Sequence, residues 1–110
     1  MQEQIVKGVR LNAKTGTRPV HIDGHKTLPA LLRARCQANG EATAHREKDL
    51  GIWQAYSWND YLRHARLIAM GLRHLGLQKG EVISILSEDN KEWMYIDMAA
   101  QCLGAVSSGV

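Results

Sequence analysis

Apolar and polar positions follow two different periods along the chain, and the change between them is clearest near its end. Residues 82–86 form a short apolar run, Val-Ile-Ser-Ile-Leu, which is typical of a strand buried on both faces of a parallel sheet. Residues 93–103 carry apolar side chains at helical spacing, and Gly104 follows where a left-handed residue ends a helix. Residues 105–110 again suit a strand. The pattern predicts a βαβ unit within a larger doubly wound α/β sheet.

The helix predicted at 93–103 has a candidate N-cap in Asp89, with Glu92 three residues later in a capping-box arrangement. Five side chains form its apolar face and four more widen it. These are Trp93, Ile96, Ala99, Ala100 and Leu103, then Met94, Tyr95, Met98 and Cys102. A face this wide predicts a helix that is buried on more than one side.

Two further elements are predicted upstream. A short helix starts after the candidate N-cap Thr27, tolerates Pro29 in its first turn and ends at Asn39-Gly40. Its apolar side is formed by Leu28, Leu31, Leu32 and Cys36. Residues 42–47 and 52–56 then predict a β-hairpin around the four-residue loop Lys48-Asp49-Leu50-Gly51.

A long amphipathic helix is predicted after Ser57, which is a candidate N-cap with Asp60 three residues later. Apolar residues keep the helical period from Trp58 to Leu75, and Gly76 ends the pattern. The opposite face is basic and carries Arg63, Arg66, Arg73 and His74. We interpret this face as solvated, because no aromatic residues interleave with it, and contact with phosphates is the alternative.

Composition places the chain among soluble globular proteins, with 45% hydrophobic and 23% charged residues. No apolar run approaches the roughly 18 residues that a membrane helix needs, and residues 1–10 lack the pattern of a signal peptide. We therefore expect a cytoplasmic location. In a reducing compartment, Cys36 and Cys102 are expected to be buried thiols and not a disulfide.

Residues 1–26 form a basic leader or extended arm, with five basic and two acidic residues, whereas bases and acids balance in residues 27–110. A short strand is expected near Val20–Ile22. His21 and His25 stand four apart, but the turn signal Asp23-Gly24 lies between them, so we do not expect a metal site. We interpret the leader as a solvated tail; peripheral contact with an anionic membrane or with nucleic acid is the alternative.

Several short motifs follow one another from Thr27 to Val110. They are residues 27–32 (TLPALL), 46–54 (REKDLGIWQ), 56–58 (YSW), 71–72 and 75–77 (GL and LGL), 79–82 (KGEV), 89–93 (DNKEW), 99–100 (AA) and 103–106 (LGAV). In order and spacing they resemble the N-terminal segment of an AMP-forming acyl-CoA synthetase, an adenylate-forming enzyme of the long-chain fatty acid–CoA ligase type. The resemblance covers about three-quarters of the chain.

The resemblance implies an enzyme that converts a carboxylate and ATP to an acyl-adenylate and then to a coenzyme A thioester, with Mg²⁺. Its Ser/Thr/Gly-rich phosphate loop, ribose-binding Asp, adenine-side aromatic and catalytic Lys have no counterpart here. Ser107-Ser108-Gly109 is assigned to the last strand and not to such a loop. We therefore predict no catalytic, cofactor-binding or metal residue. Residues 27–110 are expected to be an incomplete N-terminal portion of an AMP-binding domain, a scaffold that is inactive alone.

The expected partner is the remainder of such a synthetase, or a second copy that pairs with the strand at 105–110. Without the strands that would flank it in such a synthetase, this strand would leave Val106 and Val110 on a free edge. Residues 105–110 contain no Lys or Pro that would discourage pairing with another chain. The alternative function is a stand-alone interaction protein derived from this fold. A nucleic-acid-binding module ranks below both, because residues 27–110 carry no excess of positive charge.

Overall fold

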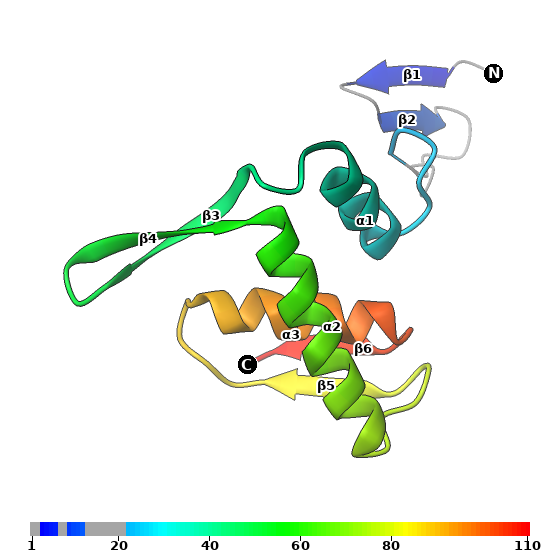
Figure 1. The fold of residues 1–110 in the computed structure, drawn as a ribbon. Coiled ribbons are helices and arrows are strands. Elements are labelled where there is room, and N and C mark those ends of the chain that lie inside the picture. The colour runs from blue at the N-terminus through cyan, green and yellow to red at the C-terminus, as the bar shows by residue number, and fades with distance from the viewer. Residues whose placement is uncertain (1–2, 7–8, 13–21) are drawn as a thin grey trace.

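The computed structural model describes residues 3–6, 9–12 and 22–110 (Figure 1). His21, and most of the strand expected near Val20–Ile22, lie outside the described residues. The elements are β1 (Glu3–Val6), β2 (Val9–Asn12), α1 (Leu28–Asn39), β3 (Thr43–Asp49), β4 (Ile52–Ser57), α2 (Trp58–His74), β5 (Val82–Ile85), α3 (Lys91–Cys102) and β6 (Val106–Gly109). The strands form three two-stranded sheets, β1–β2, β3–β4 and β5–β6, in the described part of the chain.

The βαβ unit predicted at the end of the chain is confirmed. β5 and β6 pair in parallel from Val82↔Val106 to Ile85↔Gly109, and α3 connects them. The helix begins at Lys91, two residues earlier than predicted. It ends as predicted, because Gly104 has a φ of 71° and so supplies the left-handed residue after the cap.

The prediction that this sheet is buried on both faces is wrong for the described residues. Side chains alternate along β5, so Ile83 and Ile85 face α3, and Ile85 is buried. Val82 lies on the other face and is 62% exposed. The large apolar side chains exposed on that outer face or just beyond its strands are Val82, Leu86, Val106 and Val110.

The core lies where α1, α2 and α3 meet. Leu32, Ala65 and Met98 are its buried centre, with one residue from each helix. Ala65 on α2 and Ala99 on α3 have no exposed surface, so small side chains let these two helices approach closely. The wide apolar face predicted for α3 is confirmed by its four buried residues, Tyr95, Met98, Ala99 and Ala100.

The two cysteines are free thiols, as predicted, but they are not both buried. Cys102 is exposed at the end of α3, and Cys36 is half-buried. Burial nevertheless raises the pKa of both thiols above their ordinary value. The prediction of two buried thiols was wrong for Cys102, which lines an open hollow beside the end of α2.

Two of the three predicted helix caps are confirmed. The Thr27 hydroxyl accepts a hydrogen bond from the Ala30 N–H at 3.2 Å. Ser57 and Asp60 form a full capping box, in which each side chain accepts a bond from the other residue's N–H, at 3.1 and 3.0 Å. Asp89, however, is not the cap of α3, since Asn90 occupies that position and its side chain makes no capping bond.

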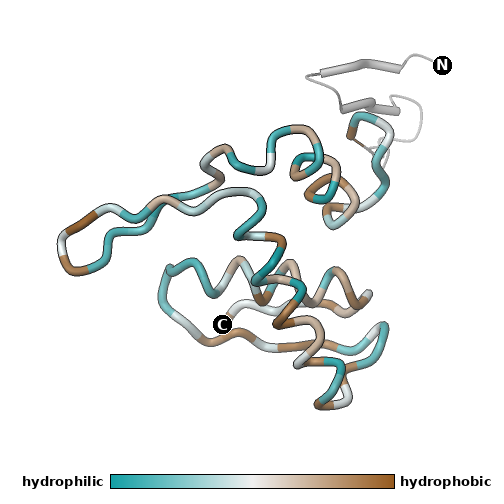
Figure 2. Tube along the Cα trace, in the orientation of Figure 1, coloured by the Kyte–Doolittle hydropathy of each residue, from teal (hydrophilic) through white to brown (hydrophobic). Residues whose placement is uncertain are grey.

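The β3–β4 hairpin is longer than predicted and its loop is shorter. Strand pairing continues through Lys48↔Trp53 and Asp49↔Ile52, so the loop is only Leu50-Gly51. Both residues have positive φ, 49° and 82°, as a type I′ turn requires. The four-residue loop was predicted from the gap between the runs at 42–47 and 52–56, whereas the two-residue turn places Leu50 in a backbone conformation that is unusual for Leu. Figure 2 shows apolar residues at the hairpin tip, where Leu50 is 94% exposed.

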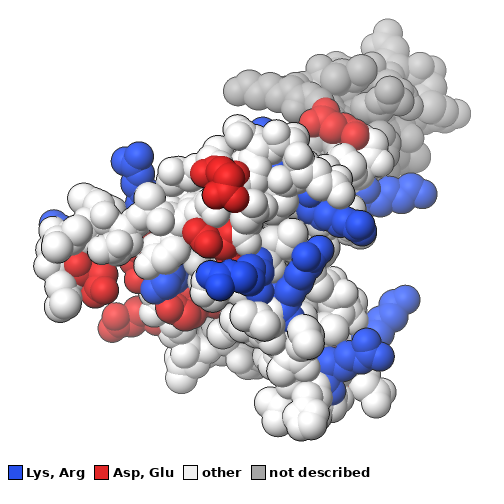
Figure 3. Space-filling view, viewed as in Figure 1, with Lys and Arg blue, Asp and Glu red and all other residues white. Residues whose placement is uncertain are grey.

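Charged side chains are unevenly distributed over the surface. In the view of Figure 3, acidic side chains lie mostly over the hairpin and the start of α2, and basic ones gather further along α2. Among the described residues, no helix is long and apolar enough to cross a membrane.

Candidate functional site

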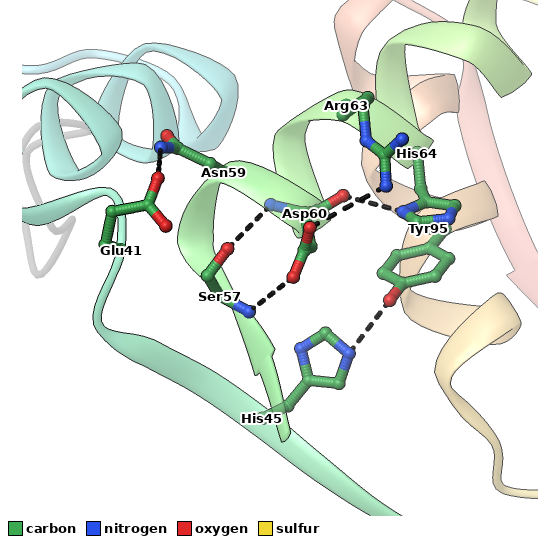
Figure 4. Close-up of polar contacts among 8 residues, drawn as sticks. All are labelled: Glu41, His45, Ser57, Asn59, Asp60, Arg63, His64 and Tyr95. Carbon is green, nitrogen blue, oxygen red and sulfur yellow. Dashed lines mark hydrogen bonds and ion pairs between the residues drawn. The ribbon is translucent and has the colours of Figure 1, made fainter. Parts of the chain in front are cut away.

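Polar and aromatic side chains gather where the hairpin meets α2 and α3. We call this group, made of His45, Tyr56, Tyr61, His64 and Tyr95, the hairpin–helix cluster. Figure 4 shows His45, His64 and Tyr95 converging from β3, α2 and α3. Side chains from four elements, β3, β4, α2 and α3, thus meet at one junction, so this is the first place to look for chemistry.

His45 is held on several sides. Its Nε2 atom lies 2.9 Å from the Tyr95 hydroxyl oxygen, in a hydrogen bond whose donor depends on the tautomer. Its ring stacks on Tyr56 with centroids 5.0 Å apart. Its Nδ1 atom is buried and has no hydrogen-bond partner among the described residues. A second proton on Nδ1 would therefore lack an acceptor, which favours the neutral imidazole.

The pKa values at this junction also favour a neutral His45 imidazole. Burial, the largest cause, lowers the pKa of His45; the carboxylate of Glu47 opposes this effect and the ammonium of Lys91 adds to it. Burial also raises the pKa of Tyr95 to about 12, so its phenol stays protonated at neutral pH. A neutral imidazole bonded to a protonated phenol ties β3 to α3, and neither group is tuned to exchange protons near pH 7.

His64 supports Tyr95 from the other side. Its ring is stacked on the Tyr95 ring with centroids 4.9 Å apart and planes 10° from parallel. Its Nδ1 atom lies 2.8 Å from the backbone carbonyl oxygen of Asp60, one turn earlier on α2, and this bond fixes the ring. His64 therefore works as a packing residue between α2 and α3.

Charged side chains also meet at the first turn of α3, where Lys91 lies between Glu47 and Glu92. The Glu47 carboxylate accepts hydrogen bonds from the Lys91 backbone N–H at 2.7 Å and from Lys91 Nζ at 3.2 Å. Nζ also lies 2.9 Å from Glu92 Oε1. The hydrogen bonds to Glu92 and to Glu47 raise the pKa of Lys91 above its ordinary value. Its ammonium is held by two carboxylates and is not poised to act as a base.

Asp97 on α3 connects the helix to the last strand. One carboxylate oxygen accepts a hydrogen bond from the Ser107 hydroxyl, and the other accepts one from Gln101 Nε2 at 3.1 Å. Ser107 is therefore engaged in holding β6 against α3. This agrees with the assignment of residues 107–109 to a strand and not to a phosphate loop.

The hollows that lie between the helices and their connections in the described residues include the following two. One, of about 440 Å³, is mostly apolar and is lined by residues that include Leu28, Leu31, Trp58 and Met98. The other, of about 500 Å³, lies between the end of α2 and the end of α3 and includes Arg73, Lys79 and Cys102. Neither brings a nucleophile together with a general base.

The described residues also contain no group of three or more His, Cys, Asp or Glu that could hold a metal ion. His25 is engaged through its backbone, which forms a bridge with Ile22. The sequence predicted no catalytic, cofactor-binding or metal residue, and that stays a prediction. Sequence reasoning missed the contacts of His45 and Glu47, whose partners stand 50 and 44 residues away, so no local pattern announces them.

Comparison with known proteins relates the fold to a family. Residues 32–110 match the family described as AMP-binding enzyme. An uncharacterized protein of Mycobacterium tuberculosis, Rv1549, is 35% identical over 57 residues, which are 52% of this chain and 33% of that protein. The long-chain-fatty-acid–CoA ligase ACSBG1 of Bos taurus is 25% identical over 92 residues, 84% of this chain and 13% of the ligase.

A solved structure shares the fold. The fatty acid AMP ligase from Legionella pneumophila superposes with a TM-score of 0.75 at 14% identity, over 79% of this chain and 15% of the ligase. At this identity the likeness concerns the fold alone. The chain spans no more than about a third of the length of any of these three proteins.

Proposed function

The chain belongs to the AMP-binding enzyme family, and from this premise we propose that it forms the N-terminal structural part of an AMP-forming acyl-CoA ligase. Such an enzyme converts a carboxylate and ATP to an acyl-adenylate and pyrophosphate, and then transfers the acyl group to the thiol of coenzyme A. The observation that carries the proposal is the family match over residues 32–110, supported by ligase relatives that align over most of this chain.

The role we propose for these residues is scaffold. The α1–α2–α3 core and the cap that Glu47 gives to α3 hold the β5–β6 strand pair in place. The described residues offer no cluster of His, Cys, Asp or Glu side chains for Mg²⁺. Lys91 and Ser107 are already bonded to carboxylates. ATP, Mg²⁺ and coenzyme A would therefore be held by other parts of the enzyme.

The scaffold role is tested by carboxylate-dependent exchange of pyrophosphate into ATP. The purified 110-residue chain is assayed with acetate, octanoate and palmitate, beside an intact ligase such as FadD15 of Mycobacterium tuberculosis as positive control. We expect no exchange above the blank, because adenylate chemistry needs positioned donors and cations around the phosphates. Carboxylate-dependent exchange by the chain itself would overturn the scaffold role.

A stand-alone interaction protein is the second candidate. The exposed outer face of β5–β6, with Val82 and Val106 more than half exposed, favours it. The two functions separate experimentally, because an interaction protein would fold cooperatively and bind a defined partner without ligase sequence.

For the ligase we propose a cytoplasmic location, where ATP and coenzyme A are supplied.

A further inference from the structure

The outward face of α2 combines cationic and apolar side chains. Six positions share it, and all are exposed: Arg63, Arg66, Leu67, Met70, Arg73 and His74. At 100° per residue these positions fall within an arc of roughly 120° and extend for about 16 Å along the helix. We call this surface the α2 outer face. It carries three arginines and no acidic residue.

The apolar members of this face are not needed for the core. The buried residues of α2, Ala65 and Ala69, lie on its opposite side. Leu67 is 59% exposed and Met70 is 68% exposed. Single exposed apolar side chains are common on protein surfaces, but here two large ones lie one turn apart among three arginines. The face therefore suits a partner that takes up apolar side chains as well as positive charge.

The charges around this face leave most of its arginines available. Asp60, in the first turn of α2, lies 3.7 Å from Arg63 and partly neutralises that one guanidinium. Among the described residues, no ion pair within 4.0 Å involves Arg66 or Arg73. Lys79 lines the same hollow as Arg73 and adds positive charge beyond the end of the helix. Figure 3 shows basic side chains gathered in this region.

We propose that the α2 outer face docks on an anionic lipid bilayer, with the helix axis parallel to the membrane surface. Leu67 and Met70 would enter the boundary between headgroups and acyl chains, while Arg66 and Arg73 bind anionic headgroups. Long side chains of arginine suit this arrangement, because their apolar stems lie along the boundary and the charged ends reach the headgroups. The proposal concerns a surface and does not depend on the ligase function.

Nucleic acid, the other common polyanion, fits this face less well. Single strands are bound by stacking bases on aromatic side chains, and the α2 outer face has none. Leu67 and Met70 would gain little beside a phosphate backbone, whereas they gain burial in a bilayer. Leu67 and Met70 therefore favour an anionic bilayer over nucleic acid as the partner of this face.

The test is co-sedimentation of the full 110-residue chain with vesicles. Vesicles of phosphatidylglycerol and phosphatidylcholine are compared with vesicles of phosphatidylcholine alone. The variants are Arg66→Gln with Arg73→Gln, and Leu67→Ser with Met70→Ser. The matched control is Arg33→Gln with Arg46→Gln, which removes two exposed arginines from α1 and β3. Because all six positions are exposed, circular dichroism of every variant should match that of the original chain.

We expect binding to the anionic vesicles only. Loss of the two α2 arginines should weaken it about 25-fold, or about fivefold for each arginine. The serine variant should also bind at least about tenfold more weakly, and the control should stay within about twofold. Three results would each overturn the proposal: no binding of the original chain at low salt, equal loss in the control, or unchanged binding in the serine variant. Tighter binding to single-stranded DNA than to the anionic vesicles would assign the face to nucleic acid instead.

Discussion

The carboxylate of Glu47 caps a helix that begins 44 residues later, by accepting hydrogen bonds from the backbone N–H and the Nζ of Lys91 at 2.7 and 3.2 Å. Asn90, the residue at the N-cap position, contributes no side-chain bond. A carboxylate near the positive end of the helix dipole is stabilising, and here it is delivered by another element. The hairpin is thereby fastened to α3 at a point that local sequence does not reveal.

The first prediction follows from this cap. Glu47→Ala should lower the free energy of unfolding by about 2 kcal/mol, because a helix N–H loses its acceptor and the Lys91 ammonium loses one of its two carboxylates. Glu47→Gln should cost less, because the amide oxygen can still accept from the N–H. Chemical denaturation measures both, with Asp49→Ala on the exposed end of the same strand as control. An equal loss for Asp49→Ala and Glu47→Ala would contradict the cap.

A second prediction concerns pH. Burial lowers the pKa of His45 below its ordinary value of 6.5 in the folded protein, so the unfolded chain binds this proton first as the pH falls. The free energy of unfolding should therefore decrease as the pH falls through 6.5 toward the lower pKa of the folded state. Asp60 and Glu92, whose pKa values are lowered from 3.8 and 4.5, titrate below this window.

The variant His45→Gln should flatten this dependence when thermal unfolding is followed between about pH 5 and pH 7.5. His74→Gln, at the exposed end of α2, is the control and should keep the slope of the original chain. If His45→Gln keeps the original slope, burial does not hold His45 in its neutral form.

The third prediction compares two tryptophans. Trp93 is half-buried, and its indole Cζ2 lies close enough to Gly109 that an added Cβ there would be 3.1 Å away. Trp53 is 65% exposed on the hairpin. Trp93→Ala should therefore cost about 2 kcal/mol, below the 3–5 kcal/mol of a fully buried ring, and Trp53→Ala less than about 1 kcal/mol. Equal shifts of the urea midpoint in the two variants would refute this placement.

Local patterns predicted the elements that depend on near neighbours. The capping box of Ser57 and Asp60 spans three residues, and the period of α2 spans its own turns, so both could be found in the sequence. The βαβ unit was predicted for the same reason, since a β-branched run, a helical period and Gly104 follow one another directly. The larger doubly wound sheet was inferred from this unit, and the resemblance to adenylate-forming enzymes added the family.

Features that depend on residues far away in the sequence, or on an unfavourable backbone conformation, were not predicted. Asp89 looked like the cap of α3 because it precedes the helix, but Glu47 takes that role from across the fold. The hairpin loop was misjudged because Leu50 accepts a φ of 49°, which residue preferences disfavour. Burial of β5 on both faces needs covering elements, and among the described residues only one face has them. The hairpin–helix cluster, built from five positions in four elements, had no local signal.

A fourth prediction addresses the outer face of β5–β6. Because Val106 is 54% exposed and Val110 79% exposed beside a free strand edge, we expect the chain to self-associate. Sedimentation velocity should show a sedimentation coefficient that rises with concentration. Val106→Lys, or deletion of residues 105–110, should reduce this rise, whereas Leu75→Lys at the exposed end of α2, outside the strand pair, should not. A monomer at every concentration would show that this face does not pair.

The most direct test of the central claim, that this chain is scaffold of an AMP-forming ligase, is a chimera. Residues 22–110 replace the aligned segment of FadD15 from Mycobacterium tuberculosis, a long-chain-fatty-acid–CoA ligase 25% identical over 89 residues. Palmitate-dependent exchange of pyrophosphate into ATP is then measured, with a FadD15 that lacks the segment as control. The account predicts exchange in the chimera and none in the deletion. A chimera that is folded by circular dichroism, yet gives no more exchange than the deletion, would contradict it.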